Sequence, residues 1–312
     1  QSVTVEKSFL ATSKNSAAFI HFQKLLTRLR TRKIELEQKG VAAEPRVEPV
    51  LVQLAGESGV GKSNLAYFLS ADIMAGDSEY DPNDYTKSFY FRNVETEFWD
   101  GYCGQPVVVY DDYGQKTDSS AAPNPEFHEI IRMCNIAPYT LHMAKLADKG
   151  TTPFSAKVII LTSNKISYNI QSLTHSMALN RRMNKRVIVK NHDKYVINGK
   201  LDFTKAKVPT DVYYFEEVDV DDKPIRTLSY AELVKELREE KSRTAAFCNQ
   251  RIGFLQEYAK ASHAFAVAND NKTDLWGGDD KPLEVNFIAP PPVSSAIPER
   301  LQRELTKEEL RE

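Results

Sequence analysis

The sequence predicts a three-layer αβα fold, in which a largely parallel sheet lies between two layers of helices. Short runs rich in Val, Ile and Leu recur between residues 50 and 207. Each run is too short for a helix and apolar enough for a strand that is buried on both faces. Helical patterns and Gly- or Pro-rich turns alternate with these runs, as expected for consecutive strand–helix–strand units.

The composition is that of an ordinary globular protein. The 312 residues include 41% hydrophobic and 27% charged side chains, which excludes collagen-like, disordered and disulfide-rich chains. The chain has no apolar run of about 18 residues, the length that predicts a membrane-spanning helix. Three Cys residues fit no disulfide frame or zinc pattern and favour a reducing compartment. A net charge of −2 argues against a uniformly basic coat for nucleic acid but leaves room for a local basic channel.

The predicted elements follow one another from residue 50. The strand at 50–54 leads through a Gly-rich turn into a helix from residue 64. A second helix is expected over 125–134, and residues 158–161 form the most apolar strand candidate. The other strand candidates are short apolar or aromatic runs: residues 88–91, 107–110, 186–189, 195–197 and 212–215. We expect 186–189 and 195–197 to pair with each other around a turn at 191–193.

The flanking regions have a different character. Residues 17–38 show a helical pattern that could pack on the core, on a neighbouring subunit or on an anionic membrane surface. Ser229 and Glu232 have the spacing of a capping box and predict a helix that continues to about residue 268. The chain therefore divides into a helical and linker segment (1–44), the α/β domain (45–215), a C-terminal helical extension (216–268) and a linker with a charged tail (269–312).

A glycine-rich loop follows the first strand and fits the pattern G-x-x-x-x-G-K-[ST]. Glycines allow backbone N–H groups to turn toward phosphate oxygens, and the next helix directs its partly positive N-terminus at the anion. Lys62 can reach the β- and γ-phosphates, and the Ser63 hydroxyl can ligate Mg²⁺. The alternative is an ordinary Gly-rich turn. The predicted nucleotide-binding residues are Gly56, Glu57, Ser58, Gly59, Val60, Gly61, Lys62 and Ser63.

Two carboxylates, Asp111 and Asp112, end the apolar strand at 107–110. Ligands collect at the carboxyl ends of parallel strands, where acidic side chains can hold Mg²⁺ and polarise an attacking water. We assign Asp111 to Mg²⁺ and Asp112 to water activation. The alternative is that both are turn residues, but their position about 50 residues after the glycine-rich loop favours the functional interpretation.

Polar and basic residues farther along could complete such a site. Asn164 lies at the end of the buried strand at 158–164, where its amide could lie between a γ-phosphate and the attacking water; the alternative is a turn cap. Arg181 and Arg182 could stabilise phosphoryl charge, since the guanidinium stays charged, and a neighbouring subunit could donate them. In isolation, a solvated basic pair is equally plausible.

The order of these four segments resembles the superfamily 3 helicases, and specifically the 2C-type ATPase of picorna-like positive-strand RNA viruses. Residues 111–115 (Asp-Asp-Tyr-Gly-Gln) and 143–150 (Met-Ala-Lys-Leu-Ala-Asp-Lys-Gly) also resemble segments of that family, as does Pro153-Phe154. The resemblance covers about residues 45–215, and the form of the glycine-rich loop is more similar to the insect-infecting branches.

The resemblance implies a P-loop (AAA+-like) ATPase core with helical N- and C-terminal extensions. It implies ATP and Mg²⁺ as cofactors, and ATP hydrolysis that powers RNA unwinding or translocation in viral RNA replication. Expected partners are further copies of the chain in a ring, usually a hexamer, together with viral RNA and other viral replication proteins. Lys149 would lie near the pore, where it could contact RNA phosphate. Only Cys248 lies where some relatives carry a zinc site, so we expect no zinc.

The expected location is the host cytoplasm, on membranous replication complexes, with peripheral membrane contact. Because the chain begins with Gln1, we expect it to be cut from a polyprotein, with any stronger membrane anchor upstream. A second hypothesis is a membrane- and RNA-binding scaffold that ATP switches between assembly states without unwinding. A third, less favoured hypothesis is a cellular ring ATPase with unrelated substrates.

Overall fold

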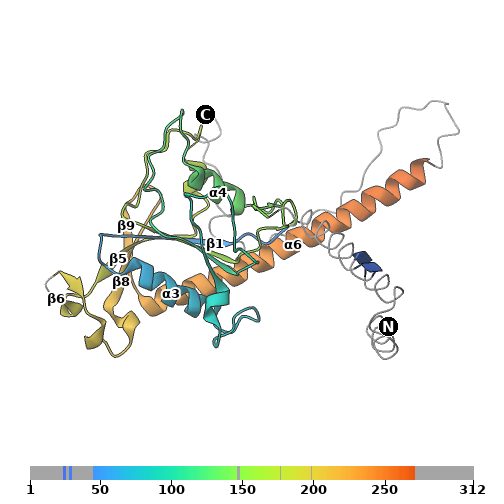
Figure 1. Ribbon diagram of the computed structural model, residues 1–312. Coiled ribbons are helices and arrows are strands. Elements are labelled where there is room, and N and C mark those ends of the chain that lie inside the picture. The colour runs from blue at the N-terminus through green and yellow to red at the C-terminus, as the bar shows by residue number, and fades with distance from the viewer. Residues whose placement is uncertain are drawn as a thin grey trace.

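Seven strands of the described residues form one sheet in the order β2-β3-β4-β1-β5-β8-β9 (Figure 1). The structure is a computed structural model that describes residues 24–25, 28–29, 45–145, 148–175, 177–197 and 199–270. Most of the helix expected at 17–38, and nearly all of the predicted tail at 269–312, lie outside these residues. None of the described helices has the length and apolar character needed to cross a membrane.

The five strands from β2 to β5 in this order are parallel, and β8 and β9 extend the sheet in antiparallel fashion. The central strands β1 and β4 are buried along their whole length, because helices cover both faces. The strands are β1 (Val50–Ala55), β2 (Phe89–Phe91), β3 (Val107–Tyr110), β4 (Val158–Ser163), β5 (Lys185–Asn191), β8 (Tyr213–Val218) and β9 (Pro224–Ser229).

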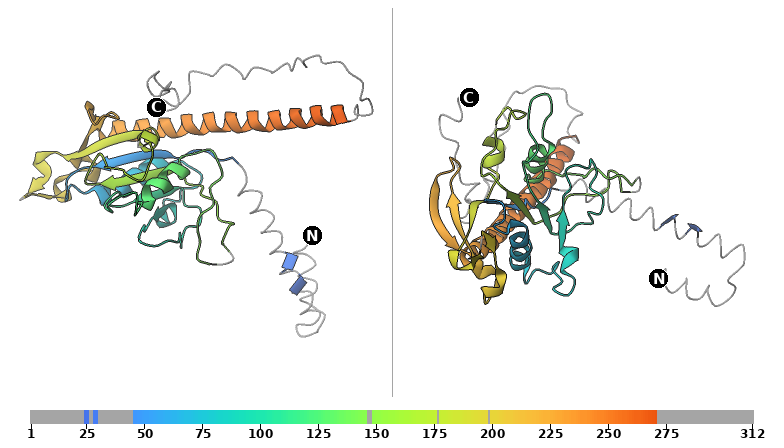
Figure 2. Two further views of the ribbon diagram at one scale, coloured as in Figure 1. Left: turned by 90° about the horizontal axis from the view of Figure 1, so that it is seen from above. Right: turned by 60° about the vertical axis from the view of Figure 1, so that its left-hand side comes forward.

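Two hydrophobic cores lie on opposite faces of the sheet, because successive side chains of a strand point to opposite faces. Val50, Val52 and Leu54 of β1 belong to one core, with α3 (Lys62–Met74) and the first turns of α6 (Tyr230–Asp270). Leu51 belongs to the other core, with α4 (Pro125–Met133) and α5 (Met177–Asn180). Figure 2 shows the helices on the two sides of the sheet, and the predicted three-layer architecture is confirmed.

The helix predicted from the capping box is present as α6. The Glu232 backbone N–H donates to Ser229 Oγ at 3.3 Å, and the Ser229 N–H donates to Glu232 Oε2 at 2.8 Å. These reciprocal bonds satisfy donors at the start of the helix. Figures 1 and 2 show that α6 continues well past the sheet. Short 3₁₀ helices occur at Tyr85–Ser88, Asp193–Tyr195, Phe203–Lys205 and Pro209–Val212.

The predicted pairing of residues 186–189 with 195–197 is wrong. β5 pairs with β1 and β8, because Val187 and Val189 are buried in the core on the α3 side. Residues 196–197 form β6 (Val196–Ile197), which pairs with β7 (Lys200–Leu201) in a separate two-stranded hairpin. Both side chains of β6 are exposed, so burial does not draw this strand into the main sheet.

The sheet continues past residue 215, where the α/β domain was predicted to end. β8 reaches Val218, and β9 then forms the outer strand before α6 begins. Residues 216–229, which were expected in the helical extension, are therefore mostly extended chain of the central sheet.

Candidate functional site

The glycine-rich loop, residues 56–63, connects β1 to α3 and requires glycine at two of its turns. Gly59 and Gly61 have φ values of 88° and 85°, which L side chains rarely adopt. A Cβ atom on Gly61 would lie 2.8 Å from Tyr213 Oη, and that hydroxyl donates to Gly61 O at 3.0 Å. In the described part of the chain, no side chain caps the start of α3. The first N–H groups of the helix are therefore available to an anion.

The Lys62 ammonium group lies over the loop and contacts Asn164. Lys62 Nζ donates to Gly56 O and Glu57 O, each at 2.8 Å, and to Asn164 Oδ1 at 2.9 Å. Burial lowers the pKa of Lys62, and the nearby Asp112 and Asp111 carboxylates oppose that shift. Asn164 reaches the loop because β1 and β4 are adjacent parallel strands, with Ala55 beside Ser163.

Ser63 and Asp111 also meet, as the sequence predicted. Ser63 Oγ lies 3.1 Å from both carboxylate oxygens of Asp111. The Thr162 hydroxyl donates to Asp111 Oδ1 at 2.5 Å, and Asp112 N donates to that hydroxyl at 3.0 Å. A hydroxyl and a carboxylate at this separation match the oxygen ligands that Mg²⁺ prefers. Thr162 was not predicted; its only signal was a polar residue within an apolar strand.

Asp111 and Asp112 differ in their surroundings. Asp111 is bonded to Ser63 and Thr162. Asp112 has a φ of 55°, in the left-handed region, which is unusual for a residue other than glycine. In the described part of the chain, its carboxylate accepts no hydrogen bond and remains open to a water molecule.

Arg181 and Arg182 follow α5, and within the described part of the chain the structure does not bring them to Lys62, Ser63 or Asp111. The Arg181 side chain is exposed, and Arg182 Nη1 donates to Ala178 O on the preceding turn. Within the described residues, Lys62, Ser63 and Asp111 make their hydrogen bonds with other groups. Lys149 is also exposed, in the turn that follows Asp148.

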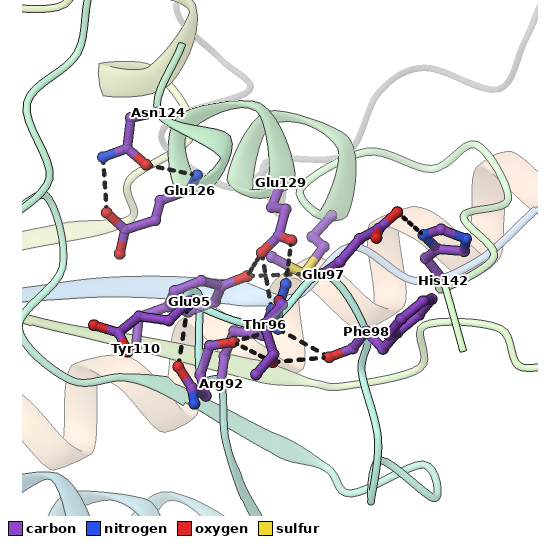
Figure 3. A network of polar contacts seen from close by, with 12 residues as sticks. Arg92, Glu95, Thr96, Glu97, Phe98, Tyr110, Asn124, Glu126, Glu129 and His142 are labelled. Carbon is purple, nitrogen blue, oxygen red and sulfur yellow. Dashed lines mark hydrogen bonds and ion pairs between the residues drawn. The ribbon is translucent and has the colours of Figure 1, made fainter. Parts of the chain in front are cut away.

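A buried network on α4, which the sequence analysis missed, supports the end of β3 just before Asp111 (Figure 3). Tyr110 Oη donates to Glu129 Oε2 at 2.7 Å, and Arg92 Nη2 lies 2.8 Å from Glu129 Oε1. The Arg92 guanidinium also lies 4.7 Å from the centroid of the Trp99 ring. The Tyr110 hydroxyl thus ties the end of β3 to α4, and the same carboxylate holds Arg92, which follows the neighbouring strand β2.

Glu126, one turn earlier on α4, holds the other side of the acidic pair. Its carboxylate accepts from Gly114 N at 3.0 Å and from Asn124 Nδ2 at 2.9 Å. Burial raises the pKa of Glu126, although these hydrogen bonds oppose the shift. Helix α4 therefore contacts the segments on both sides of Asp111 and Asp112.

A second unpredicted network holds the chain after Asn164. Gln53 Nε2 on β1 donates to Ile166 O at 2.9 Å, and Arg186 Nη2 on β5 donates to the same oxygen at 3.0 Å. Arg186 also pairs with Asp222 at 2.6 Å, in the turn between β8 and β9. Residues from three separate parts of the sheet thus position the segment next to Asn164.

Comparisons with known proteins identify a family and several relatives of this chain. Residues 52–165 match a family model described as RNA helicase. The chain is 48% identical over 154 residues, 49% of its length, to the replicase polyprotein of Acute bee paralysis virus (strain Rothamsted). It is 32% identical over 292 residues (85% of this chain) to that of Drosophila C virus. It is 35% identical over 258 residues (74%) to that of Cricket paralysis virus. The chain spans only 8%, 16% and 14% of these three relatives.

Proposed function

This chain belongs to the RNA helicase family, which its residues 52–165 match, and it is similar to replicase polyproteins of insect-infecting picorna-like viruses; on that premise we propose that it is an ATPase that acts on RNA. The resemblance predicted from the sequence is confirmed, including the insect-infecting branch. A helicase or NTPase role in viral replication follows from the family. We propose in addition that the nucleotide is ATP, that the metal ion is Mg²⁺ and that individual residues have the roles given below.

One observation carries the proposal: groups from the glycine-rich loop and from the ends of β3 and β4 lie within hydrogen-bonding distance of each other. Lys62 contacts Asn164, and Ser63 contacts Asp111. The loop N–H groups and Lys62 would hold the phosphates of ATP. Ser63 and Asp111 would hold Mg²⁺, which neutralises charge on phosphate oxygens. These are the positions at which ligands collect in open α/β sheets.

The attacking water would lie between Asp112 and Asn164. The Asp112 carboxylate would accept its proton, and the Asn164 amide would orient it toward the γ-phosphate. The open carboxylate of Asp112 supports this assignment, because Asp111 is already bonded to Ser63 and Thr162. Catalysis would consist mainly of positioning and charge stabilisation.

The proposed assembly is a ring of identical subunits in which Arg181 and Arg182 of one subunit complete the site of the next. The exposed side chain of Arg181 is compatible with that role. We further propose that the ring works with viral RNA and other replication proteins, on membranous replication complexes in the host cytoplasm. The ring assembly and these partners are proposed from the family resemblance.

The decisive experiment is steady-state phosphate release from ATP, with and without single-stranded RNA. Lys62→Ala should abolish turnover, and Lys205→Ala, which changes an exposed lysine far along the chain, should not. Turnover that rises with RNA supports coupling of hydrolysis to RNA, and strand separation is then the next assay. Turnover that is indifferent to RNA favours an ATP-switched scaffold. Normal turnover by Lys62→Ala refutes the nucleotide site.

A further inference from the structure

We propose that two carboxylates of α6, Glu240 and Glu236, are positioning residues for the turn that carries Arg181 and Arg182. The inference rests on the proposed function, in which these arginines complete the site of a neighbouring subunit. The two carboxylates would set the arginines in place through a contact between α6 and the start of β5.

Asn184 fixes the point at which the arginine turn joins the sheet. Its backbone N–H donates to Leu51 O at 2.9 Å, and its side-chain Oδ1 accepts from Leu51 N at 2.9 Å. Asn184 thus satisfies both backbone polar groups of one residue in β1, just before the regular pairing of β5 begins. Only Met183 separates it from Arg182.

Glu240 holds the remaining side of the Asn184 amide. Asn184 Nδ2 donates to Glu240 Oε1 at 2.7 Å, and Glu240 is 6% exposed. The two partners define the orientation of the amide, because Leu51 N requires an acceptor and the carboxylate requires a donor. The other carboxylate oxygen of Glu240 pairs with Arg243 at 2.9 Å. Loss of Glu240 would leave a partly buried amide N–H without its partner.

Glu236 holds the next residue of the chain. It lies four residues before Glu240 and hence on the same face of the helix. Its Oε2 is 2.8 Å from Lys185 Nζ, which also pairs with Glu217 on β8 at 2.7 Å. Arg226 on β9 bridges the same two carboxylates, at 2.7 Å from each. Asn184 and the first residue of β5, Lys185, are therefore held by consecutive turns of α6.

The arginine turn is anchored at both ends. Leu179 is fully buried and Met183 is 8% exposed, so the residues on either side of the pair lie in the core. Within the turn, Arg182 N donates to Leu179 O at 3.0 Å and Met183 N to Asn180 O at 3.1 Å. Arg181 is exposed between these anchors. Asn184 directly follows the second of these anchors, so we expect a shift of Asn184 to be passed through Met183 to Arg181.

Glu240→Ala tests the inference, with Glu239→Ala, which changes the exposed neighbour, as the matched control. We expect Glu240→Ala to lower kcat by about 100-fold, the loss that a displacement of about 1 Å at a catalytic site can cause, with nucleotide affinity unchanged. Glu240→Gln should stay near the parent rate, because its amide oxygen still accepts from Asn184. A normal kcat for Glu240→Ala overturns the inference.

Mixing Glu240→Ala subunits with other variants shows whether the substitution displaces the arginines or damages the whole subunit. Glu240→Ala subunits have an intact nucleotide site and a displaced arginine, so Lys62→Ala subunits should restore turnover to them. Subunits that carry both Arg181→Ala and Arg182→Ala should not. No recovery with Lys62→Ala overturns the inference, as does recovery with the arginine-deficient subunits.

Two further experiments cover the remaining outcomes. If Lys62→Ala and arginine-deficient subunits do not rescue each other, the shared site of the proposed function is wrong, and this inference falls with it. If Glu240→Ala does not fold, Asn184→Asp should lower kcat by placing two carboxylates face to face. Adding Glu240→Gln should restore kcat, because the donor and acceptor are then exchanged. If kcat of the double variant stays low, the Asn184–Glu240 contact does not position the arginines.

Discussion

The side-chain oxygen of Asn164 accepts a hydrogen bond from Lys62 at 2.9 Å across 102 residues of sequence. The same ammonium group also donates to two carbonyls of its own loop, so its three protons are shared among three oxygens. A bound phosphate would compete with these oxygens for Lys62. The contact therefore joins the residue that would hold the γ-phosphate to the residue that would orient water.

Asn164→Ala should slow ATP hydrolysis without weakening nucleotide binding. We expect kcat to fall about 100-fold, because one preorganised group at the reacting phosphate is removed. Nucleotide affinity should stay constant or rise slightly, since Lys62 loses a competing acceptor. The measurement is kcat together with the Kd of a fluorescent ATP analogue, with Asn83→Ala on the surface as control. An unchanged kcat would remove Asn164 from the site.

Ser63→Ala should change the Mg²⁺ requirement of turnover. Removing one proposed ligand should raise the Mg²⁺ concentration for half-maximal phosphate release by about tenfold or more. Asp111→Asn should have a larger effect, because the charged ligand is lost. A Mg²⁺ titration checks both variants against Ser78→Ala, which changes an exposed serine. The assignment fails if the midpoint is the same in all three.

Arg186→Ala should destabilise the fold. The Arg186 side chain is 5% exposed and bonds Gln53, Ile166 O and Asp222, so its removal leaves several polar partners unsatisfied. We expect a loss of about 3 kcal/mol in the free energy of unfolding, because the buried side-chain oxygen of Gln53 and the Ile166 carbonyl lose a charged donor. Urea denaturation measures this loss, with Lys235→Ala on the surface of α6 as control. Equal stability of the two variants would contradict the prediction.

Asp118→Asn should weaken the dependence of the free energy of unfolding on pH under acidic conditions. Burial alone would raise the pKa of Asp118, but hydrogen bonds from the backbone N–H groups of Asn124, Ser172 and Gln171 outweigh it and lower the pKa to about 2. This folded-state pKa lies below the ordinary value of 3.8. The stabilisation is therefore complete above about pH 4 and is lost as the pH falls toward 2.

The test for Asp118 is the free energy of unfolding measured between pH 2 and pH 5. The parent chain should lose stability over this range, and Asp118→Asn should lose less. Asp221→Asn, at an exposed position, should keep the slope of the parent chain. A slope in Asp118→Asn equal to that of the parent would show that this carboxylate carries no acid-sensitive stability.

Sequence reasoning succeeded where one physical signal was strong. The runs at β1, β3 and β4 are fully buried and consist mostly of apolar residues, so their strand character is visible locally. The contacts of Lys62 with Asn164 and of Ser63 with Asp111 follow from the loop pattern and from the adjacency of parallel strands. Asp111, Asp112 and Asn164 could thus be located before any coordinates were known.

Other features depend on tertiary contacts and leave no local signal. β9 is an outer strand with one buried side chain, Leu228, so its sequence lacks the alternation of a half-buried strand. Thr162, Gln53 and Arg186 are buried polar residues, and in a sequence they look the same as polar residues on the surface. Gln53, for example, bonds a carbonyl 112 residues farther along the chain, and Arg186 bonds one 20 residues before it. No short-range sequence pattern could reveal such contacts.

The length of α6 gives its contact with β5 a mechanical meaning. A helix of 41 residues is about 60 Å long, and Glu240 lies about a quarter of the way along it. Leu233, Leu237, Thr244 and Cys248 are buried along the first half of the helix, while Phe254, Tyr258 and Phe265 farther along are exposed. The helix is therefore a rod that is clamped along one half, and Glu240 lies inside the clamp. The hold of Glu240 on Asn184 is for this reason insulated from whatever contacts the exposed far half of α6.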